Sequence, residues 1–437
     1  MTGPRVDAIG DRYDVVVVGG GPAGLTAGVT AARAGASVAL LDARRLGGRS
    51  AVDRVGDTDD ILFNRGPHAF YQGGAAASVL MSLGIRPTGG TAPVRGSWLY
   101  HDDGEFVLMP TGPTALLRTQ ALSIASKVRA GALLAGIGRI DAAALSGRTA
   151  AEWIEQRSGG SASAAAVLAA IVRVATYASD LDTLSADVAV SQVALAVKSG
   201  VRYLDGGFQQ IVDRLESVGR TAGMTVRTAT PVTSIRQTGT GWILEADGRR
   251  IDAGSIVLAA GGPDTARRLL GGDPGWGTLG ADMTAACLEL AVRVEPSRRF
   301  ALGLDSPLYL STHCPPADLA PPGIRVVHVM RYGSTSSDAD RATLTTLARR
   351  AGITAEDVVE ERFLHRMVVA HAQATVDRGG LSGRPLVTVP NRDGAFVAGD
   401  WVGPIGHLCD ASIASGADAG ARAASHARTH TTAVMSR

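Results

Sequence analysis

A glycine-rich stretch near the N-terminus constrains the fold more than any other part of this 437-residue chain. Before it, the four consecutive valines of Tyr13–Gly19 (YDVVVVG) predict a strand of a parallel sheet, because a strand buried on both faces shows no polar alternation. After it, small residues from Pro22 to about Ala34 predict a helix that packs closely on a sheet, and Ser37–Leu41 predicts a second strand. The N-terminus is therefore predicted to form a β-α-β unit.

The glycines between the first strand and the helix form the pattern G-x-G-x-x-G as Gly19, Gly21 and Gly24. They permit a tight turn, close approach of the backbone to a pyrophosphate, and contact between helix and strand. The N-terminus of the helix directs free N–H groups and a partial positive charge at that anion. Asp42 follows the second strand, 18 residues beyond Gly24, where its carboxylate can accept hydrogen bonds from ribose hydroxyls. In this context the pattern predicts a dinucleotide site.

Composition and charge exclude several classes of protein. The formal net charge is only +2, and aromatic residues make up 4% of the chain, so we expect no nucleic-acid partner. The cysteines Cys287, Cys314 and Cys409 are too few for a disulfide framework and lack the C-x-x-C spacing of a metal site. Residues 1–12 are too charged for a signal peptide, and no apolar run is long enough to span a membrane. We expect a cytoplasmic protein.

The middle and end of the chain differ in character from the N-terminus. Residues 113–200 are rich in Ala, Leu and Ser and predict several helices. A turn is predicted at Asp247-Gly248, and a C-terminal helix from about Ser412 to Ala427. The remaining strands are predicted at Thr225–Val232, Ile235–Gln237, Gly241–Ala246, Ile251–Ala259, 284–295, 324–331 and Ala395–Ala398.

The residues after Asp42 resemble a known family. LDARRLGGRS (Leu41–Ser50) is similar to the flavin-containing amine oxidase and phytoene desaturase superfamily, in which an acidic residue is followed by L-G-G-R. In that family, the residues that match Gly47, Gly48 and Arg49 pass the FAD pyrophosphate and reach toward the flavin. A guanidinium is suited to that place, because its planar fork neutralises phosphate or a reduced flavin anion. The resemblance implies that the cofactor is FAD.

Three further segments resemble the same family in the same order. They are FNRGPHAFY (Phe63–Tyr71), the strand pair within Ala229–Gly261, and GAFVAGDWVGPIGHLCDASIASGADAGARAA (Gly394–Ala424). In the family these segments lie beside the isoalloxazine, on the adenine side, and along the ribityl chain and flavin pyrimidine. The positions that the pattern and the resemblance assign to FAD binding are Gly19, Gly21, Pro22, Ala23, Gly24, Asp42, Ala43, Gly48, Arg49, Gly66, Pro67, His68, Val232, Ala260, Gly261, Gly399, Asp400, Ser412 and Ile413.

Two departures from the amine oxidases favour another branch of this superfamily. Amine oxidases usually place a lysine near flavin N5, but no lysine occurs after Lys198, so the matching region 283–294 has none. They also flank the substrate nitrogen with aromatic rings, where this chain has His407, Leu408 and Cys409. The chain resembles more closely the phytoene desaturase and protoporphyrinogen oxidase branch, through N-x-G-P-H and the segment 203–215. That resemblance implies dehydrogenation of a bulky, mostly apolar molecule by hydride transfer from carbon to FAD.

Two other functions stay open at this point. One is a flavin-dependent amine or amino-acid oxidase. The other is a non-catalytic protein on the same fold, like the prenylated-GTPase escort proteins of the superfamily. No second G-x-G-x-x-G is present for a nicotinamide cofactor, so we expect oxygen or a quinone-like carrier as the electron acceptor.

Several side chains are candidates for the reaction itself. His68 and His407 are predicted to be catalytic as proton donors or acceptors, the alternative being structural histidines bonded to backbone. Cys409 is interpreted as a flavin attachment point or a packing residue, and Asp410 as a cap of the following helix or a substrate contact. Arg331 or Arg95 could bind a carboxylate. The further pocket-lining candidates are Tyr177, Tyr203, Tyr309, His328 and Tyr332.

The fold class predicted from these patterns is α/β. A Rossmann-type FAD-binding domain, like that of the glutathione reductase-like flavoproteins, is expected from residues 1–75, 201–275 and 386–437. A substrate domain with a mixed sheet and helices is expected from residues 76–200 and 276–385. The helices of 113–175 are predicted either to contact a membrane surface or to bury their apolar side in the core. We expect a monomer or a homodimer.

Overall fold

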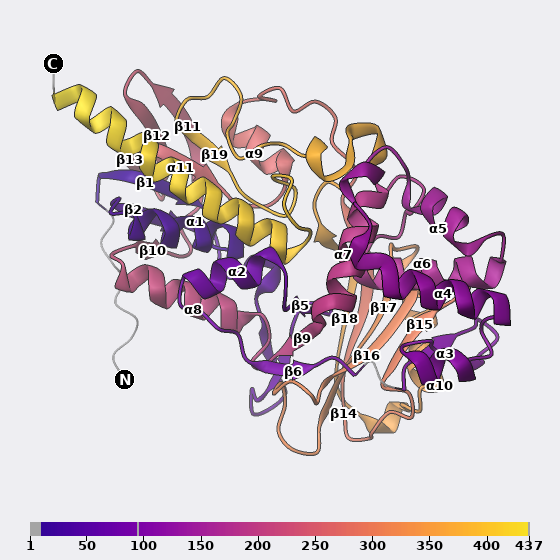
Figure 1. The fold of residues 1–437 in the computed structure, drawn as a ribbon. Helices are drawn as coiled ribbons and strands as arrows, with labels where there is room; N and C mark the ends of the chain where they lie inside the picture. The colour runs from indigo at the N-terminus through magenta and orange to yellow at the C-terminus, as the bar shows by residue number, and fades with distance from the viewer. Residues whose placement is uncertain (1–9, 94–95, 436–437) are drawn as a thin grey trace.

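Two units lie side by side in this molecule, each around a seven-stranded sheet (Figure 1). The computed structural model describes residues 10–93 and 96–435, and the side chains as far as residue 429. The expected α/β class, with a Rossmann-type unit and a unit of mixed sheet plus helices, is confirmed. The limits predicted for the two domains stay a prediction. Among the described residues, no helix combines the length and the apolar character that a membrane span requires.

The first sheet has the strand order β10-β2-β1-β13-β12-β11, with β19 also paired to β13. Strands β10, β2, β1, β13 and β19 run parallel, whereas β11 and β12 form an antiparallel extension. Its strands are β1 (Arg12–Val18), β2 (Val38–Leu41), β10 (Thr225–Arg227), β11 (Val232–Thr238), β12 (Gly241–Ala246), β13 (Arg249–Leu258) and β19 (Ala395–Val397). The helices of this unit are α1 (Pro22–Arg33), α2 (Ala75–Ser82), α8 (Gln209–Thr221), α9 (Pro263–Leu270) and α11 (Cys409–Met435).

Most local predictions for this unit are confirmed, and two need correction. The β-α-β unit is present as β1, α1 and β2, and Asp247 and Gly248 make the expected turn with φ angles of 52° and 69°. The strand expected over 225–232 ends at Arg227, because Ala229 takes a left-handed conformation (φ 51°) and its N–H donates to the carbonyl of Arg44. The C-terminal helix begins earlier and ends later than predicted, at Cys409 and Met435.

Helix α11 crosses the first unit and packs against α1 (Figure 1). The contact is close because two glycines of α11 face the backbone of α1. A β-carbon on Gly416 would lie 2.3 Å from the carbonyl oxygen of Ala23, and one on Gly420 would lie 2.2 Å from that of Ala27. This packing fixes the N-terminal end of α11 relative to the glycine-rich turn that begins α1.

The second sheet has the strand order β18-β14-β17-β16-β15-β7-β8. Its strands are β7 (Trp98–Tyr100), β8 (Phe106–Leu108), β14 (Met283–Val292), β15 (Phe300–Gly303), β16 (Leu308–Cys314), β17 (Arg325–Tyr332) and β18 (Val358–Ala370). The helices of this unit are α3 (Pro113–Arg118), α4 (Ile124–Gly136), α5 (Ala150–Ser158), α6 (Ala162–Thr176), α7 (Ala186–Ser199) and α10 (Ser337–Arg350). The strands expected at 284–295 and 324–331 and the helices expected over 113–200 are therefore present, whereas β7, β8, β15, β16 and β18 are additional to the prediction.

Short strands connect the two units. Strands β5 (Phe70–Tyr71) and β6 (Gly89–Thr91) pair on either side of β9 (Val201–Leu204), and β3 (Asp53–Val55) pairs with β4 (Ile61–Phe63). They carry the chain from the first sheet to the second. The segment between β4 and β5, which contains the predicted G-P-H motif, therefore lies between the two units.

Candidate functional site

The glycine-rich turn and the loop after β2 are joined at the carboxyl end of the first sheet. The N–H of Gly20 donates to Asp42 Oδ2 at 2.6 Å, and the N–H of Gly47 donates to the carbonyl of Gly20 at 2.8 Å. The N–H of Thr230 donates to the carbonyl of Asp42 at 2.8 Å, which brings the predicted adenine-side strand β11, with Val232, to the same place. Ligands of open parallel sheets bind at this edge.

The glycines of the turn meet the spatial demands of a bound pyrophosphate. A β-carbon on Gly24 would lie 1.9 Å from the carbonyl oxygen of Gly19, so helix and strand approach as closely as a dinucleotide turn requires. At Gly21 and Gly48 the situation is the reverse, because a β-carbon would meet nothing nearer than 3.9 Å. The two glycines face each other, and side chains there would fill the space between them. This cradle fits a diphosphate.

Arg49 and Asp400 bring together the L-G-G-R motif after β2 and the C-terminal motif that begins at Gly394. Arg49 Nη1 lies 2.8 Å from Asp400 Oδ2 and donates to the carbonyl of Val369 at 2.9 Å. The N–H of His371 also donates to Asp400 Oδ2, at 3.2 Å. Asp400 is buried, yet its Oδ1 has no partner among the described residues. An orphaned buried carboxylate oxygen is costly, and a ribityl hydroxyl of FAD would satisfy it.

The other residues predicted to bind FAD lie beside the glycine-rich turn, after Asp42 and at the first turns of α11. A β-carbon on Gly19 would lie 2.7 Å from the backbone of Ala260, so the end of β13, with Gly261 after it, adjoins the turn. The N–H of Gly399 donates to Ser415 Oγ at 3.0 Å, which holds the last motif against α11. Ser412 Oγ donates to the carbonyl of Leu408, which precedes α11, and Ile413 is buried in the core, so both contribute through the first turns of α11. The remaining predicted positions, Pro22, Ala23 and Ala43, lie in the first turn of α1 and after Asp42.

His68 is held by its own loop. Its Nδ1 donates to the carbonyl of Gly66 at 3.0 Å, and its ring contacts that of Phe208 with 4.9 Å between centroids. Since the carbonyl can only accept, Nε2 is left as the unprotonated nitrogen. Burial lowers the pKa of His68, and the charge of Arg49 acts in the same direction. His68 is therefore neutral at physiological pH.

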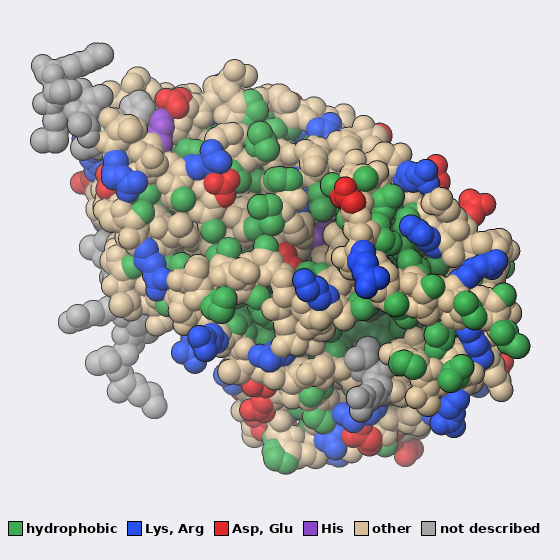
Figure 2. All heavy atoms as spheres, in the orientation of Figure 1, with side chains coloured by type: hydrophobic (Ala, Val, Ile, Leu, Met, Phe, Trp, Pro, Cys, Tyr) green, Lys and Arg blue, Asp and Glu red, His purple; other side chains and the backbone are tan. Residues whose placement is uncertain are grey.

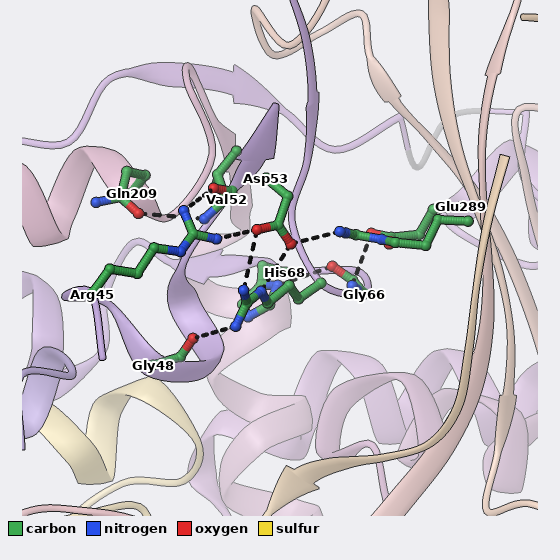
Figure 3. Close-up of polar contacts among 10 residues, drawn as sticks. Arg45, Gly48, Val52, Asp53, Gly66, His68, Gln209 and Glu289 are labelled. Carbon is green, nitrogen blue, oxygen red and sulfur yellow. Dashed lines mark hydrogen bonds and ion pairs between the residues drawn. The ribbon is translucent and has the colours of Figure 1, made fainter. Parts of the chain in front are cut away.

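A buried carboxylate from the second unit holds the same loop from the other side (Figure 3). Glu289 on β14 is fully buried, and its Oε1 accepts the N–H of Gly66 at 2.9 Å. Its Oε2 pairs with Arg362 on β18 at 2.6 Å. Burial raises the pKa of Glu289, although the charge of Arg362 opposes this. The loop that carries His68 is thus fixed by a residue of the second sheet.

Asp53 connects this ion pair to the predicted cofactor loop (Figure 3). Its carboxylate pairs with Arg362 at 2.6 Å, with Arg65 at 2.9 Å, and with Arg45. Arg65 also donates to the carbonyl of Gly48 at 3.4 Å. Burial alone would raise the pKa of Asp53, but the hydrogen bonds from Arg65 and Arg362 outweigh it and the pKa is lowered. The network therefore runs from the second sheet to the loop that contains Gly48.

His407 is also neutral and also bonded to backbone. Its Nε2 donates to the carbonyl of Thr176 at 2.9 Å, and burial lowers its pKa to about 4. No contact within the described parts of the chain joins it to His68. Asp410, expected to cap its own helix or to touch substrate, instead accepts the N–H of Ala76 at 2.7 Å and caps α2. Burial raises the pKa of Asp410 to about 6.

Five buried tyrosines gather between these segments and the second sheet, and we call them the tyrosine cluster: Tyr71, Tyr177, Tyr203, Tyr309 and Tyr332. The rings of Tyr177 and Tyr332 are nearly perpendicular at 5.9 Å, and the hydroxyls of Tyr203 and Tyr309 lie 3.4 Å apart. Burial raises the pKa of every hydroxyl in the cluster. The cluster is therefore uncharged.

Two buried histidines continue the cluster toward Glu289. His313 stacks on Tyr203 at 3.7 Å, and its ring meets that of His328 at 4.4 Å. His328 Nδ1 lies 3.5 Å from Glu289 Oε1. Burial lowers the pKa of His328 to about 3 and that of His313 well below its ordinary value. Both are neutral, so His328, a predicted pocket residue, carries no charge.

Sequence reasoning missed several of these residues. The sequence does indicate that Glu289 has a special role, because it is the one charged residue in the apolar strand MTAACLELAV. Arg331, a candidate for carboxylate binding, lies 3.6 Å from Asp340 and already faces an acid. Arg95, the other candidate, lies outside the described residues. Cys409 is partly buried and its thiol pKa is raised by burial, as expected of a packing residue.

Comparison with known proteins identifies related folds. The family described as flavin containing amine oxidoreductase matches residues 22–275. Putrescine oxidase bound to putrescine has a TM-score of 0.69 and 19% identity, over 98% of this chain and 99% of that one. Cyclohexylamine oxidase from Brevibacterium oxydans has a TM-score of 0.65 and 18% identity, over 95% of this chain and 99% of that one.

A protein from Exiguobacterium sp., provisionally described as a protoporphyrinogen oxidase, has a TM-score of 0.63 and 19% identity, over 94% of this chain and 99% of that one. No curated protein matches the chain. At these identities the solved structures show a shared fold alone. The predicted superfamily and the predicted cofactor, FAD, are confirmed.

The orphaned oxygen of Asp400 generates a prediction about cofactor retention. Asp400→Ala removes a partner of Arg49 and an acceptor for FAD, and we expect FAD affinity to fall about 10- to 100-fold, the cost of losing a charged hydrogen bond. Titration of apoprotein with FAD, followed by flavin absorbance, measures it. Asp418→Ala is the control, since Asp418 is half-exposed on α11 and pairs with Arg422. Unchanged affinity in Asp400→Ala would contradict the assigned role.

The Glu289 pair generates a second prediction, which separates positioning from stability. Glu289→Leu leaves the N–H of Gly66 without its acceptor and leaves the partly buried Arg362 paired with Asp53 instead of two acids, and we expect a loss of about 1–3 kcal/mol in the free energy of unfolding. The double variant Glu289→Leu with Arg362→Leu should regain part of that stability, yet the N–H of Gly66 stays without its acceptor. Flavin visible circular dichroism should therefore remain altered in the double variant.

The matched control for this experiment is Glu295→Gln on the same sheet unit. Glu295 pairs with Arg325 at 2.6 Å but is half-exposed. We therefore expect a loss of less than about 0.5 kcal/mol in the free energy of unfolding, and a wild-type flavin spectrum. If the double variant also shows the wild-type flavin spectrum, Glu289 does not position the loop.

Proposed function

The chain belongs to the flavin-containing amine oxidoreductase family, and we propose that within it the protein dehydrogenates a bulky, mostly apolar small molecule. When bound, FAD supplies the hydride acceptor for a carbon of the substrate. The residues of the chain hold the cofactor, exclude water and orient the substrate carbon. The electron acceptor proposed is oxygen or a quinone-like carrier.

The observation that carries this proposal is that the histidines and tyrosines around the predicted flavin face are neutral. His68 and His407 are uncharged and already bonded to backbone carbonyls, and the tyrosine cluster is uncharged too. Three tyrosines of the cluster belong to the same apolar core as Met330, and Leu408 packs against that core. A site of this kind supplies orientation and a dry surrounding rather than a charged acid or base, which suits removal of hydride from an apolar carbon.

Amine or amino-acid oxidation is the second candidate, and one observation favours it. Tyr177 and Tyr332 present nearly perpendicular rings at the cluster, which are surfaces that attract a cationic or polarised nitrogen. The absence of lysine after Lys198 weighs against it, since amine oxidases usually use one near the flavin. The likeness to putrescine oxidase and cyclohexylamine oxidase supports a common fold and does not choose between the two functions.

The test is anaerobic bleaching of the flavin by candidate substrates. Purified holoprotein is mixed without oxygen with isoprenoids, tetrapyrroles and amines, and loss of visible flavin absorbance reports reduction. We expect bleaching by an isoprenoid or a tetrapyrrole and not by the amines. Bleaching by amines with release of ammonia would establish the second candidate instead. Colourless protein that takes up no FAD would overturn both.

We also propose that α3 and α4 contact an anionic membrane surface. Leu117, Ile124 and Val128 are 76%, 83% and 69% exposed on these helices, and α3 has no buried residue. Between Glu105 and Asp141 the sequence has no acid. The cations of that stretch are Arg118, Lys127, Arg129 and Arg139. Apolar and cationic side chains lie close together over this part of the face in Figure 2. Such a surface is attracted to anionic lipid.

Vesicle flotation tests the proposed membrane contact. We expect the protein to float with phosphatidylglycerol vesicles and much less with phosphatidylcholine. The triple variant Leu117→Ser, Ile124→Ser, Val128→Ser should lose most of this binding, because apolar burial supplies much of the affinity. Leu386→Ser is the control, since Leu386 is 63% exposed on another part of the chain. Absence of flotation with anionic vesicles would contradict the proposal.

A further inference from the structure

Helix α6 carries a single charged side chain, Arg173, in an otherwise apolar sequence (ASAAAVLAAIVRVAT). It lies one helical turn before Tyr177, whose N–H donates to the carbonyl of Arg173 at 2.6 Å. Arg173 is partly buried and its Nε is completely inaccessible. Burial lowers its pKa, while Tyr332 and then Asp182 act to raise it. A guanidinium has therefore been partly removed from water inside an apolar helical layer.

This guanidinium has no protein partner in the described parts of the chain. Its Nε has no acceptor, and neither an ion pair within 4.0 Å nor a ring contact involves it. The other arginines with a buried, unpaired Nε are compensated at their other nitrogens. Arg384 donates to the carbonyls of Asp400 and Gly406, Arg378 donates to two carbonyls, and Arg298 lies over a tryptophan ring. Arg202 donates to a carbonyl as well.

A second orphaned polar group lies next to Arg173. Tyr332 is 2% exposed, and its hydroxyl has no hydrogen-bond partner among the described residues. The charge of Arg173 acts directly on this hydroxyl. The hydroxyl of Tyr332 and the Nε of Arg173 are buried polar atoms without a hydrogen-bond partner among the described residues, and each costs free energy until a ligand satisfies it. Both donate hydrogen bonds, so an acceptor with negative charge would satisfy them together.

The position of this pair relates it to the candidate flavin site. The carbonyl of Thr176 accepts from His407, and that of Ala175 accepts from the hydroxyl of Tyr71 at 2.8 Å. Both His407 and Tyr71 belong to segments that the family resemblance places at the flavin. The last turn of α6 thus spans from the flavin side to Arg173, with Tyr177 and Tyr332 between them in perpendicular contact.

We propose that Arg173 and Tyr332 bind a carboxylate of the substrate and so hold its apolar body against the tyrosine cluster. The substrate class is then an apolar carboxylic acid, with or without an amine. This deepens the proposed function and rests on it for the identity of the site. Arginine matches a carboxylate with two parallel hydrogen bonds, and the phenol of Tyr332 adds a third donor. A single cation in an apolar setting suits a singly charged carboxylate better than a doubly charged phosphate.

Binding of a matched acid and amide tests this assignment. The probes are 4-phenylbutanoate and 4-phenylbutanamide, which differ only in the charged group, with inorganic phosphate as a third ligand. Calorimetric titration of holoprotein should show the acid bound at least about tenfold more tightly than the amide, and phosphate bound weakly. Arg173→Gln should abolish the preference, and Arg173→Lys should keep part of it, because an ammonium retains the charge without the fork.

Two further variants complete the experiment. Tyr332→Phe removes only the hydroxyl and should reduce the preference several-fold while leaving the fold intact. Arg157→Gln on neighbouring α5 is the matched control, because Arg157 is exposed, and it should bind the acid like the wild type. Equal binding of acid and amide by the wild type, or a preference that survives in Arg173→Gln, overturns the assignment.

Flavin content, read from visible absorbance in each sample, separates the two proposals. Protein without flavin that still prefers the acid supports the carboxylate site and overturns the proposed function. Flavin-loaded protein that does not prefer the acid leaves the proposed function standing and overturns the carboxylate site. Phosphate bound as tightly as the acid would mean a general anion site, and it would also overturn the assignment.

Discussion

The ion pair between Glu289 and Arg362 is the constraint on which the site between the two units depends. Glu289 is fully buried, and burying a carboxylate costs several kcal/mol unless its charge is paired and its oxygens accept hydrogen bonds. Here Gly66 fills one hydrogen-bonding position on Glu289, and Asp53 fills one on Arg362. Because Gly66 belongs to the loop of His68, that loop takes its position from a sheet of the other unit. Hydrogen-bonded strands deform little, so the contact with β14 limits the movement of the loop.

Burial has a second consequence at this place, which is the loss of charge. His68, His407, His313 and His328 all have lowered pKa values, and the phenols of the tyrosine cluster have raised ones. At neutral pH it would cost a large free energy to add a proton to one of these histidines or to remove one from one of these phenols. The interior can therefore orient and desolvate a substrate far more readily than it can exchange protons with one. The proposed hydride transfer requires that the protein orient and desolvate the substrate, while the cofactor accepts the electrons.

Local patterns in the sequence predicted the Rossmann-type unit and the cofactor, whereas the FAD contacts of single residues stay a prediction. The β1-α1-β2 unit and the place of Asp42 after β2 follow from a short motif whose geometry is fixed by the turn itself, whereas the ion pair of Arg49 with Asp400 is visible only in the fold. Short motifs do not predict contacts between segments that lie far apart in the sequence. Glu289 meets Gly66 across 223 residues, and Asp410 caps α2 across 334, so nothing near either residue indicates its partner. Tyr177 and Tyr332 were named singly, but only the fold shows that they form one cluster with Tyr71.

Near-neutral total charge conceals an uneven distribution in the helical layer of the second unit. The stretch from 106 to 140 has cations and no acid, and α6 adds the guanidinium of Arg173, whose Nε has no partner among the described residues. Helices α4, α5 and α6 contact one another in succession, so both features belong to one layer. An apolar acid partitions into a bilayer with its carboxylate at the surface, since the chain is buried and the charge stays hydrated. If the proposed membrane contact and the proposed carboxylate site both hold, such a molecule would meet cations first at α3 and α4 and then at Arg173, where the guanidinium would replace water lost by its carboxylate.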